Sequence, residues 1–172
     1  MEKLNYKKAL TRITTMIFDI DGVLTDGKVL VMENGEMVRN MYSKDGYAIH
    51  LALEKSFRIV IISGGNNIAV RTALSRAGVK DIFINVKDKL QCFKEYIQKN
   101  KLSAEEVLYM GDDLPDHQVM SAVGLAVCPN DSAPEIKAIC SYISPRNGGE
   151  GCVRDIIEQV LRSQGKWEIS NW

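Results

Sequence analysis

The stretch TMIFDIDGVLTDG, residues 15–27, decides how the rest of the chain is interpreted. Residues 16–20 form an apolar run typical of a buried strand, but Asp19 interrupts that run and Asp21 follows it. A carboxylate in apolar surroundings is costly unless it is paired, hydrogen-bonded or bound to a metal ion. Two such acids at the end of a buried strand therefore indicate a functional site.

The composition is that of an ordinary globular protein. Apolar residues make up 45% of the 172 residues, and 22 Lys and Arg balance 22 Asp and Glu, so no net charge favours nucleic acid or an anionic membrane. The first apolar run is too short for a signal peptide or membrane span. The four cysteines contain no CxxC pair, which favours reduced, mostly buried thiols. We therefore expect one cytoplasmic domain spanning residues 1–172.

Six short apolar runs without polar alternation are typical of parallel strands covered on both faces. These runs are residues 16–20, 58–62, 82–86, 107–110, 124–128 and 142–143. Helical patterns lie between or after them. One predicted face holds Ile68, Ala69, Ala73, Leu74 and Ala77, a second holds Leu90, Phe93 and Ile97, and a third holds Val153, Ile156, Ile157, Val160 and Leu161. The alternation predicts an α/β fold with a doubly wound, mostly parallel, Rossmann-like sheet.

One segment breaks this alternation. KVLVMENGEMVRNMY, residues 28–42, has two extended halves around Asn34-Gly35, a strong hairpin signal. We expect a β-hairpin flap that projects from the carboxyl end of the first strand, with apolar residues that need burial. No segment is long enough to form a cap domain, and residues 165–172, with Trp167 and Trp172, are expected to form a disordered tail.

Polar residues follow the first four predicted strands, at the edge where open α/β sheets bind ligands. Several carboxylates at one edge imply a hard cation such as Mg²⁺, because like charges repel and Mg²⁺ takes oxygen ligands. A lysine, a hydroxyl and backbone N–H groups at a helix start suit a phosphoryl group. In chain order these residues are Asp19 and Asp21, then Ser63 and Gly64, then Lys89, then Asp112, Asp113 and Asp116 of GDDLPD.

The order of these motifs resembles the haloacid dehalogenase superfamily of phosphatases. FDIDGVLTDG is similar to its first motif, Ser63 to its second, Lys89 to its third and GDDLPD to its fourth. The hairpin in place of a cap, together with KDGYAIHLA, KDKL and NGGEGCVRDIIE, resembles the capless subgroup. The resemblance covers about residues 13 to 166.

The resemblance implies a role for each motif residue. Asp19 would be the nucleophile and a Mg²⁺ ligand, and Asp21 the general acid/base, which adds its backbone carbonyl to the metal. Asp112 would be the third ligand, with Asp113 and Asp116 around it, while Ser63, Gly64 and Lys89 would hold the phosphoryl oxygens. The expected enzyme is a Mg²⁺-dependent phosphatase that forms an aspartyl phosphate and assembles as a homotetramer.

The resemblance also implies a substrate, 3-deoxy-D-manno-octulosonate 8-phosphate, a lipopolysaccharide precursor. Nine-carbon keto-acid 9-phosphates (of KDN or N-acylneuraminate) are the alternative. Gly65 departs from related octulosonate phosphatases, which often carry an Arg or another large polar residue there. The glycines of RNGGEG, residues 146–151, would let the backbone approach a ligand closely. Candidate cations for the substrate carboxylate, some from a neighbouring subunit, are Arg71, Arg146, Arg154 and Lys166.

The sequence disfavours three alternative functions. A phospho-acceptor signalling domain would place its phosphorylated Asp on the third strand, but the run 82–86 contains no Asp. An inactive relative acting as a binding module is disfavoured because every motif residue is present. A phosphomutase would need a cap that closes over the site.

Overall fold

The computed structural model describes residues 5–66 and 68–168 and contains a six-stranded sheet in the order β5-β4-β1-β6-β7-β8. Every neighbouring pair of strands in this sheet is parallel, which confirms the predicted doubly wound α/β fold. The strands are β1 (Thr15–Phe18), β4 (Arg58–Ile62), β5 (Asp81–Phe83), β6 (Val107–Met110), β7 (Leu125–Cys128) and β8 (Tyr142–Ile143).

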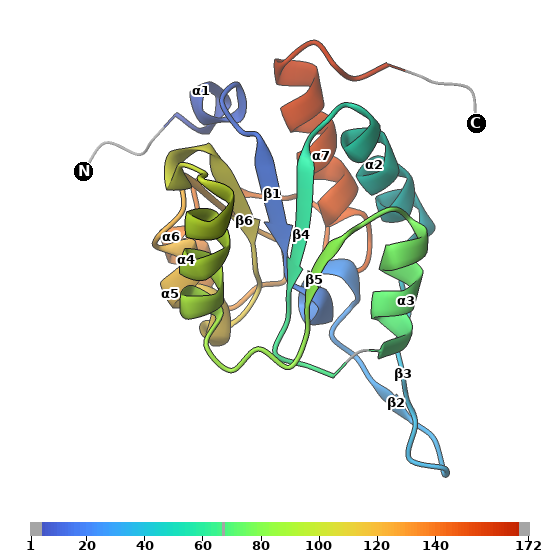
Figure 1. Ribbon diagram of the computed structural model, residues 1–172. Helices are drawn as coiled ribbons and strands as arrows, with labels where there is room; N and C mark the ends of the chain where they lie inside the picture. Colours follow the sequence, from blue (N-terminus) through green and yellow to red (C-terminus); the bar gives the residue numbers. More distant parts are fainter. Residues whose placement is uncertain (1–4, 67, 169–172) are drawn as a thin grey trace.

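Helices cover both faces of the sheet (Figure 1). One layer contains α2 (Ser43–Glu54), α3 (Ile68–Arg76) and α7 (Cys152–Ser163), with α1 (Tyr6–Leu10) near the end of α7; the other contains α4 (Lys89–Asn100), α5 (His117–Met120) and α6 (Pro134–Ile139). Along β1, Phe18 enters the first core and Ile17 the second. Because both faces are buried, the strands are apolar throughout and do not alternate.

Most strand bounds match the predicted runs, but two are shorter. β1 ends at Phe18 because the chain turns at Asp19 into a short distorted helix, η1 (Ile20–Leu24). β5 ends at Phe83 instead of residue 86. The predicted face of α3 is only partly right: Leu74 is buried as expected, but Val70 is buried as well, whereas Ile68 is 64% exposed. A second apolar stripe, which faces a groove beside the hairpin, produced that error.

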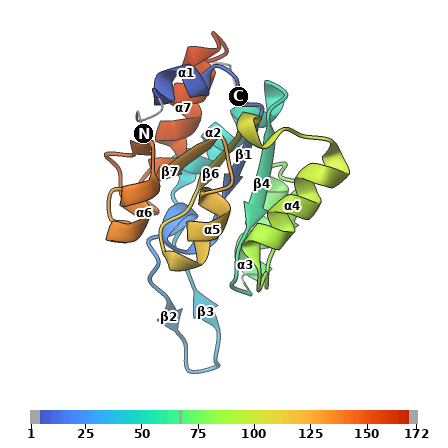
Figure 2. The ribbon, with the colours of Figure 1, turned by 90° about the vertical axis from the view of Figure 1, so that its left-hand side faces the viewer.

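The predicted hairpin is present and projects from the end of the molecule where β1 finishes (Figures 1 and 2). Its strands are β2 (Leu30–Val31) and β3 (Met37–Val38). The turn is closed by hydrogen bonds from the Met32 amide to the Glu36 carbonyl and from the Gly35 amide to the Met32 carbonyl, both 2.9 Å long. Gly35 has φ +83°, a conformation that glycine adopts easily. Within the described residues this hairpin stands where a cap domain would be inserted.

The chain end packs against α7 over the part that the structure describes. The predicted apolar face of α7 is fully buried, as expected. The ring of Trp167 lies near two guanidinium groups, 5.4 Å from Arg154 and 5.5 Å from Arg162. The prediction of disorder is therefore wrong for Trp167, and Trp172 lies outside the described residues.

The structure also bears on the predicted thiols and on membrane-spanning helices. All four cysteines are free thiols, and Cys128, Cys140 and Cys152 are buried, as the sequence predicted. None of the helices in residues 5–66 and 68–168 is both long and apolar enough to cross a bilayer.

Candidate active site

A small polar pocket of about 310 Å³ lies where β1, β4 and β6 end. Residues from all four sequence motifs line this pocket, although they come from segments far apart in the chain. The ends of parallel strands lie at one edge of a sheet, and this topology brings the four loops together. The lining residues are Asp19, Asp21, Gly22, Gly27, Ser63, Gly64, Gly65, Lys89, Asp112, Asp113, Pro115 and Asp116.

Asp19 is held in the pocket by donors on both of its carboxylate oxygens. Its Oδ1 accepts a 2.7 Å hydrogen bond from the Ile20 amide, and its Oδ2 lies 2.8 Å from Nζ of Lys89. Burial is the main cause that raises the pKa of Asp19 to about 6, and the charge of Asp116 adds to it, while Lys89 acts in the opposite direction. The carboxylate is fixed, nearly dehydrated and next to one cation.

Lys89 connects two buried carboxylates at the start of α4. Its Nζ lies 2.7 Å from Oδ1 of Asp116, which also accepts a 2.8 Å hydrogen bond from the Tyr109 hydroxyl. Burial lowers the pKa of Lys89, but the nearby carboxylates of Asp19 and Asp116 outweigh that effect and raise it above its ordinary value. Lys89 is therefore a cation in this structure. Tyr109 is a core residue of β6, and its position two residues before GDDLPD gives no sequence signal of this bond.

Asp112 lies on the loop between β6 and the short helix η3 (Leu114–Asp116). Gly22, with φ +84°, packs so closely against it that an added Cβ would lie 2.0 Å from Oδ2 of Asp112. Only a glycine leaves room for that carboxylate. Burial, followed by the charge of Asp19, raises the pKa of Asp112 to about 7. The positive charge of Lys89 lowers this pKa but does not outweigh burial and the neighbouring carboxylates.

The donor set fits a hard divalent cation. Asp19, Asp112 and Asp116 each offer a carboxylate oxygen within 4.8 Å of the other two. Both oxygens of Asp116 already accept hydrogen bonds, from Lys89 and Tyr109 on Oδ1 and from the Asp112 amide on Oδ2. Among the described residues, Asp19 accepts from only two donors, the Ile20 amide and Lys89, and is less deeply buried than Asp116. Asp19 and Asp112 are therefore better placed as ligands, with Asp116 as their support. All-oxygen coordination with few protein carboxylates is typical of Mg²⁺.

Ser63 and the two glycines after it also line the pocket. Ser63 is buried directly after β4, and its backbone bonds to β5 and to Val86, so its position is fixed by the sheet. Gly64 and Gly65 line the pocket without side chains. A hydroxyl and nearby amides without side chains are suited to an anion's oxygens.

Asp21 faces a partner that the sequence reasoning missed. Nε of Arg39 lies 2.7 Å from Oδ1 of Asp21, and Nη2 lies 3.3 Å from Oδ2. Arg39 belongs to the hairpin segment, where it was interpreted only as part of an extended half. Nothing in a single sequence pairs two residues that are 18 positions apart on a turn and a flap.

The four candidate substrate cations do not line this pocket in one chain. Arg146 and Arg154 line a separate hollow of about 540 Å³ with Tyr42 and Glu150, and Arg71 is exposed on α3. Nζ of Lys166 lies 4.5 Å from the ring centre of Phe57, which directly precedes β4, whereas the motif residue Ser63 follows that strand. A role for these residues in binding substrate stays a prediction.

The glycines of RNGGEG pack against the turn after β1. A Cβ on Gly148 would lie 2.0 Å from the carbonyl oxygen of Gly22, and the Gly149 amide donates to the Val23 carbonyl at 2.9 Å. Because these glycines lack side chains, the backbone of residues 148–149 packs directly against the turn that carries Asp21 and supports it.

Comparison with known proteins agrees with this geometry. Residues 52–156 match the family of haloacid dehalogenase-like hydrolases. The chain is 34% identical over 154 residues to 3-deoxy-D-manno-octulosonate 8-phosphate phosphatase KdsC of Escherichia coli K12, covering 90% of this chain and 82% of that protein.

Solved structures show the same likeness. The phosphatase of that name from Yersinia pestis superposes with a TM-score of 0.92 at 29% identity, covering 95% of this chain and 88% of its own. The Moraxella catarrhalis enzyme, solved with a magnesium ion, a phosphate ion and KDO, gives a TM-score of 0.91 at 25% identity over 94% of both chains. With its four motifs around one pocket, the chain belongs to the haloacid dehalogenase-like hydrolases.

Proposed function

We propose that this protein is a Mg²⁺-dependent phosphatase that hydrolyses 3-deoxy-D-manno-octulosonate 8-phosphate to KDO and phosphate. The observation that carries the proposal is the contact between the buried Asp19 carboxylate and Lys89, 2.8 Å apart, in a pocket that also holds Ser63. Likeness to KdsC supports the choice of substrate. Residues 1–172 would act as one catalytic domain.

The reaction takes place in two steps on Asp19. In the first, a carboxylate oxygen of Asp19 attacks phosphorus, the bond to the sugar oxygen breaks, and Asp21 donates a proton to that oxygen. In the second, Asp21 accepts a proton from water, which attacks the aspartyl phosphate and releases inorganic phosphate and free Asp19. Lys89, the Ser63 hydroxyl and the Gly64 amide hold the phosphoryl oxygens, where charge gathers in the transition state.

Asp19, Asp112 and the backbone carbonyl of Asp21 would hold the Mg²⁺, with Asp113 and Asp116 around them. When bound, Mg²⁺ supplies positive charge to a pocket in which the Asp19 and Asp112 carboxyls have raised pKa values. EDTA should abolish activity, and added Mg²⁺ should restore it. Full turnover in metal-free buffer would contradict this assignment.

The choice between eight- and nine-carbon substrates depends on the wall beyond the phosphate. Gly65 lines the pocket without a side chain, so a grip on the sugar from that position is missing. The deciding measurement is kcat/KM for the eight- and nine-carbon phosphates side by side, within a wider panel of phosphorylated metabolites. A clear preference for a nine-carbon acid would overturn the substrate and leave the mechanism standing.

The protein would work as a homotetramer in the cytoplasm, the compartment that suits four free thiols. The hairpin supports the assembly, because Leu30, Val31 and Met37 are each more than 60% exposed in one chain. Exposed apolar patches of this kind mark interaction sites. A second copy could also bring Arg71, Arg146 or Arg154 to the substrate, since none of them lines the motif pocket of its own chain. Light scattering that shows a fully active monomer at assay concentration would reject this.

A further inference from the structure

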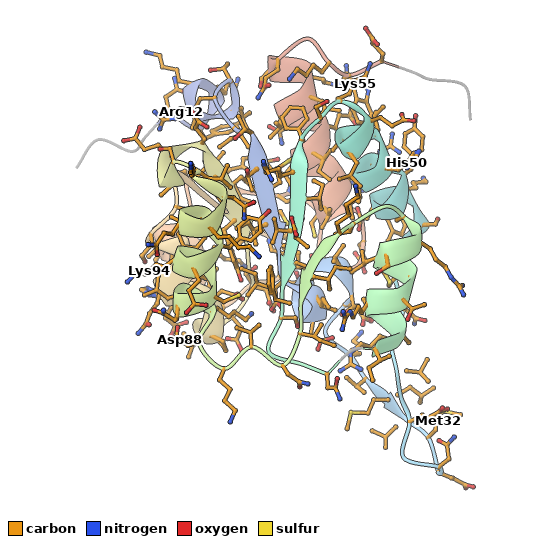
Figure 3. The ribbon with its side chains drawn as sticks, viewed as in Figure 1. Arg12, Met32, His50, Lys55, Asp88 and Lys94 are labelled. Carbon is orange, nitrogen blue, oxygen red and sulfur yellow. The ribbon has the colours of Figure 1, made fainter. Side chains whose placement is uncertain are left out.

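The side chain of Arg39 joins the hairpin to the turn that carries Asp21. Residues 27–41 are all described, and every one of them is exposed except Arg39, whose side chain is only 10% exposed. The apolar residues of β2 and β3 are exposed, and Met32, between these strands, lies on the part of the hairpin that projects from the body of the protein (Figure 3). Arg39 is thus the hairpin residue with a fixed place on the body of the protein.

The guanidinium of Arg39 contacts both oxygens of Asp21. The short bond, 2.7 Å from Nε to Oδ1, fixes the carboxylate plane, and the longer one, 3.3 Å from Nη2, reaches Oδ2. Nη1 donates to the Met37 carbonyl at 3.2 Å, which ties the guanidinium to the hairpin backbone. Each of its three nitrogens has an acceptor. A planar fork of this kind sets orientation as well as charge.

We propose that Arg39 is the positioning residue for Asp21, and that through it the conformation of the hairpin sets the rate of proton transfer to the leaving group. The inference rests on the proposed phosphatase reaction, in which Asp21 is the general acid/base. Arg39 itself touches no reacting atom in this assignment.

The local backbone shows why Asp21 needs such a partner. Its side chain is 33% exposed and lies on the η1 turn, next to Gly22, where φ and ψ are not helical. The hydrogen bond from Thr25 Oγ1 to Oδ1 is long, at 3.4 Å. The Arg39 contact, at 2.7 Å, is shorter than this bond and comes from a side chain that is only 10% exposed. A displaced acid/base can cost about 10²-fold in rate, so this restraint matters for turnover.

Arg39→Ala should slow the reaction of substrates whose leaving group needs a proton more than that of substrates whose leaving group departs as a stable anion. For an alkyl monoester such as the sugar-acid phosphate, kcat should fall by about 10²-fold, because the sugar oxygen needs a proton. For p-nitrophenyl phosphate, the pre-steady-state burst of p-nitrophenol should change less than about threefold, since that group leaves as a stable anion. Asp21→Asn should give the same pattern, and the double variant should be no slower than Asp21→Asn alone.

Two further variants complete the test. Arg39→Lys should recover part of the lost kcat, because one donor replaces the fork. Lys28→Ala removes a hairpin charge that is 87% exposed. It should leave kcat for the sugar-acid phosphate and the p-nitrophenol burst at their wild-type values. Circular dichroism should show every variant folded.

The results that overturn the inference differ from those that overturn the function. A raised KM with unchanged kcat in Arg39→Ala, or losses that multiply in the double variant, would make Arg39 a substrate-binding residue. Equal losses on both substrates would make its role structural. A wild-type protein that releases phosphate from no monoester, with Mg²⁺ present, would remove the proposed function and this inference with it.

Discussion

Two regions that follow β1 invert the usual distribution of residues in opposite ways. At the strand ends, Asp19, Lys89 and Asp116 are charged and buried. Along the hairpin, a few residues later, Leu30, Val31 and Met37 are apolar and exposed. Soluble proteins rarely bury charges without pairing them, and rarely expose apolar patches without covering them.

The two inversions are resolved at different levels. The buried charges are paired within one chain, at 2.7 and 2.8 Å, so the catalytic pocket is essentially complete in a single copy. The apolar hairpin borders a groove of about 940 Å³ shared with α3, and nothing in the described chain covers it. The paired charges are thus satisfied within the subunit, whereas the exposed apolar hairpin is the part of the chain that the proposed assembly would cover.

The largest expected effect is on the chemistry itself. Asp19→Asn should lower kcat by about 10⁶-fold, as loss of a nucleophile does in other covalent enzymes, because an amide neither attacks phosphorus nor binds a metal well. Phosphate release with Mg²⁺ present is the measurement.

The control for that variant is a neighbouring acid outside the pocket. Asp26→Asn keeps an oxygen that can accept from the Lys28 amide and should leave turnover within about twofold, as expected for a substitution near the surface. Substantial Mg²⁺-dependent activity in Asp19→Asn would show that another group is the nucleophile.

The second effect falls on assembly. Charged residues in place of Leu30 and Met37, as the double variant Leu30→Glu/Met37→Glu, should convert the oligomer to monomer in light scattering, because four or more like charges cannot be buried together. The unfolding free energy of the subunit should change by less than about 1 kcal/mol, since both side chains are exposed in one chain.

Glu33→Lys, at the exposed turn of the same hairpin, is the matched charge change and should leave the oligomer intact. A double variant that still forms the wild-type oligomer would show that the hairpins do not carry the interface.

The third effect concerns the pairing of buried charges. Lys89→Met should cost about 3–5 kcal/mol of unfolding free energy at pH 8, because Asp19 and Asp116 would remain buried without their cation. The cost should shrink at pH 5, where the pKa of Asp19, already raised to about 6 by burial, lets its proton return.

Lys94→Met on the same helix removes an exposed lysine that points away from the sheet (Figure 3) and should cost less than about 0.5 kcal/mol. Urea denaturation at both pH values, in EDTA, is the measurement. Equal costs for the two lysines would mean that the buried pairing contributes nothing to folding.

The parts predicted well from sequence are those set by local pattern. Runs such as 58–62 and 107–110 coincide with β4 and β6 because strands buried on both faces carry an unbroken apolar signal. The order of motifs at strand ends follows from parallel topology, which brings Asp19, Ser63 and Lys89 to one pocket. The hairpin turn is likewise encoded by two residues, Asn34 and Gly35.

What the sequence could not give are relations between distant side chains. The Arg39–Asp21 and Tyr109–Asp116 contacts depend on how a flap and a strand meet a loop, and no periodicity encodes them. The same limit explains the partly wrong face of α3, where two apolar stripes compete and only the tertiary packing selects Val70 and Leu74. Burial of Trp167 against guanidinium groups is also a tertiary relation.

The smallest expected effect is on the unfolding free energy, at Asp45 in the first turn of α2, where the hairpin segment joins the body of the protein. Asp45 is buried; its Oδ1 accepts from the Arg154 amide at 2.7 Å, and its Oδ2 has no hydrogen-bond partner among the described residues. Burial raises the pKa of Asp45 from 3.8 to about 6, against the weaker effect of Arg154. The folded state therefore binds the proton more tightly than the unfolded chain, and stability present below pH 3.8 is lost as the pH rises to about 6.

Asp45→Asn keeps the acceptor for Arg154 and removes the charge, so it should raise the unfolding free energy by about 2–3 kcal/mol at pH 8 and by little at pH 4.5. Glu54→Gln, an exposed acid at the other end of α2, should show no such pH dependence. Urea denaturation in EDTA at the two pH values measures both, and an Asp45→Asn variant that is destabilised at pH 8 would show that the buried charge has a stabilising partner.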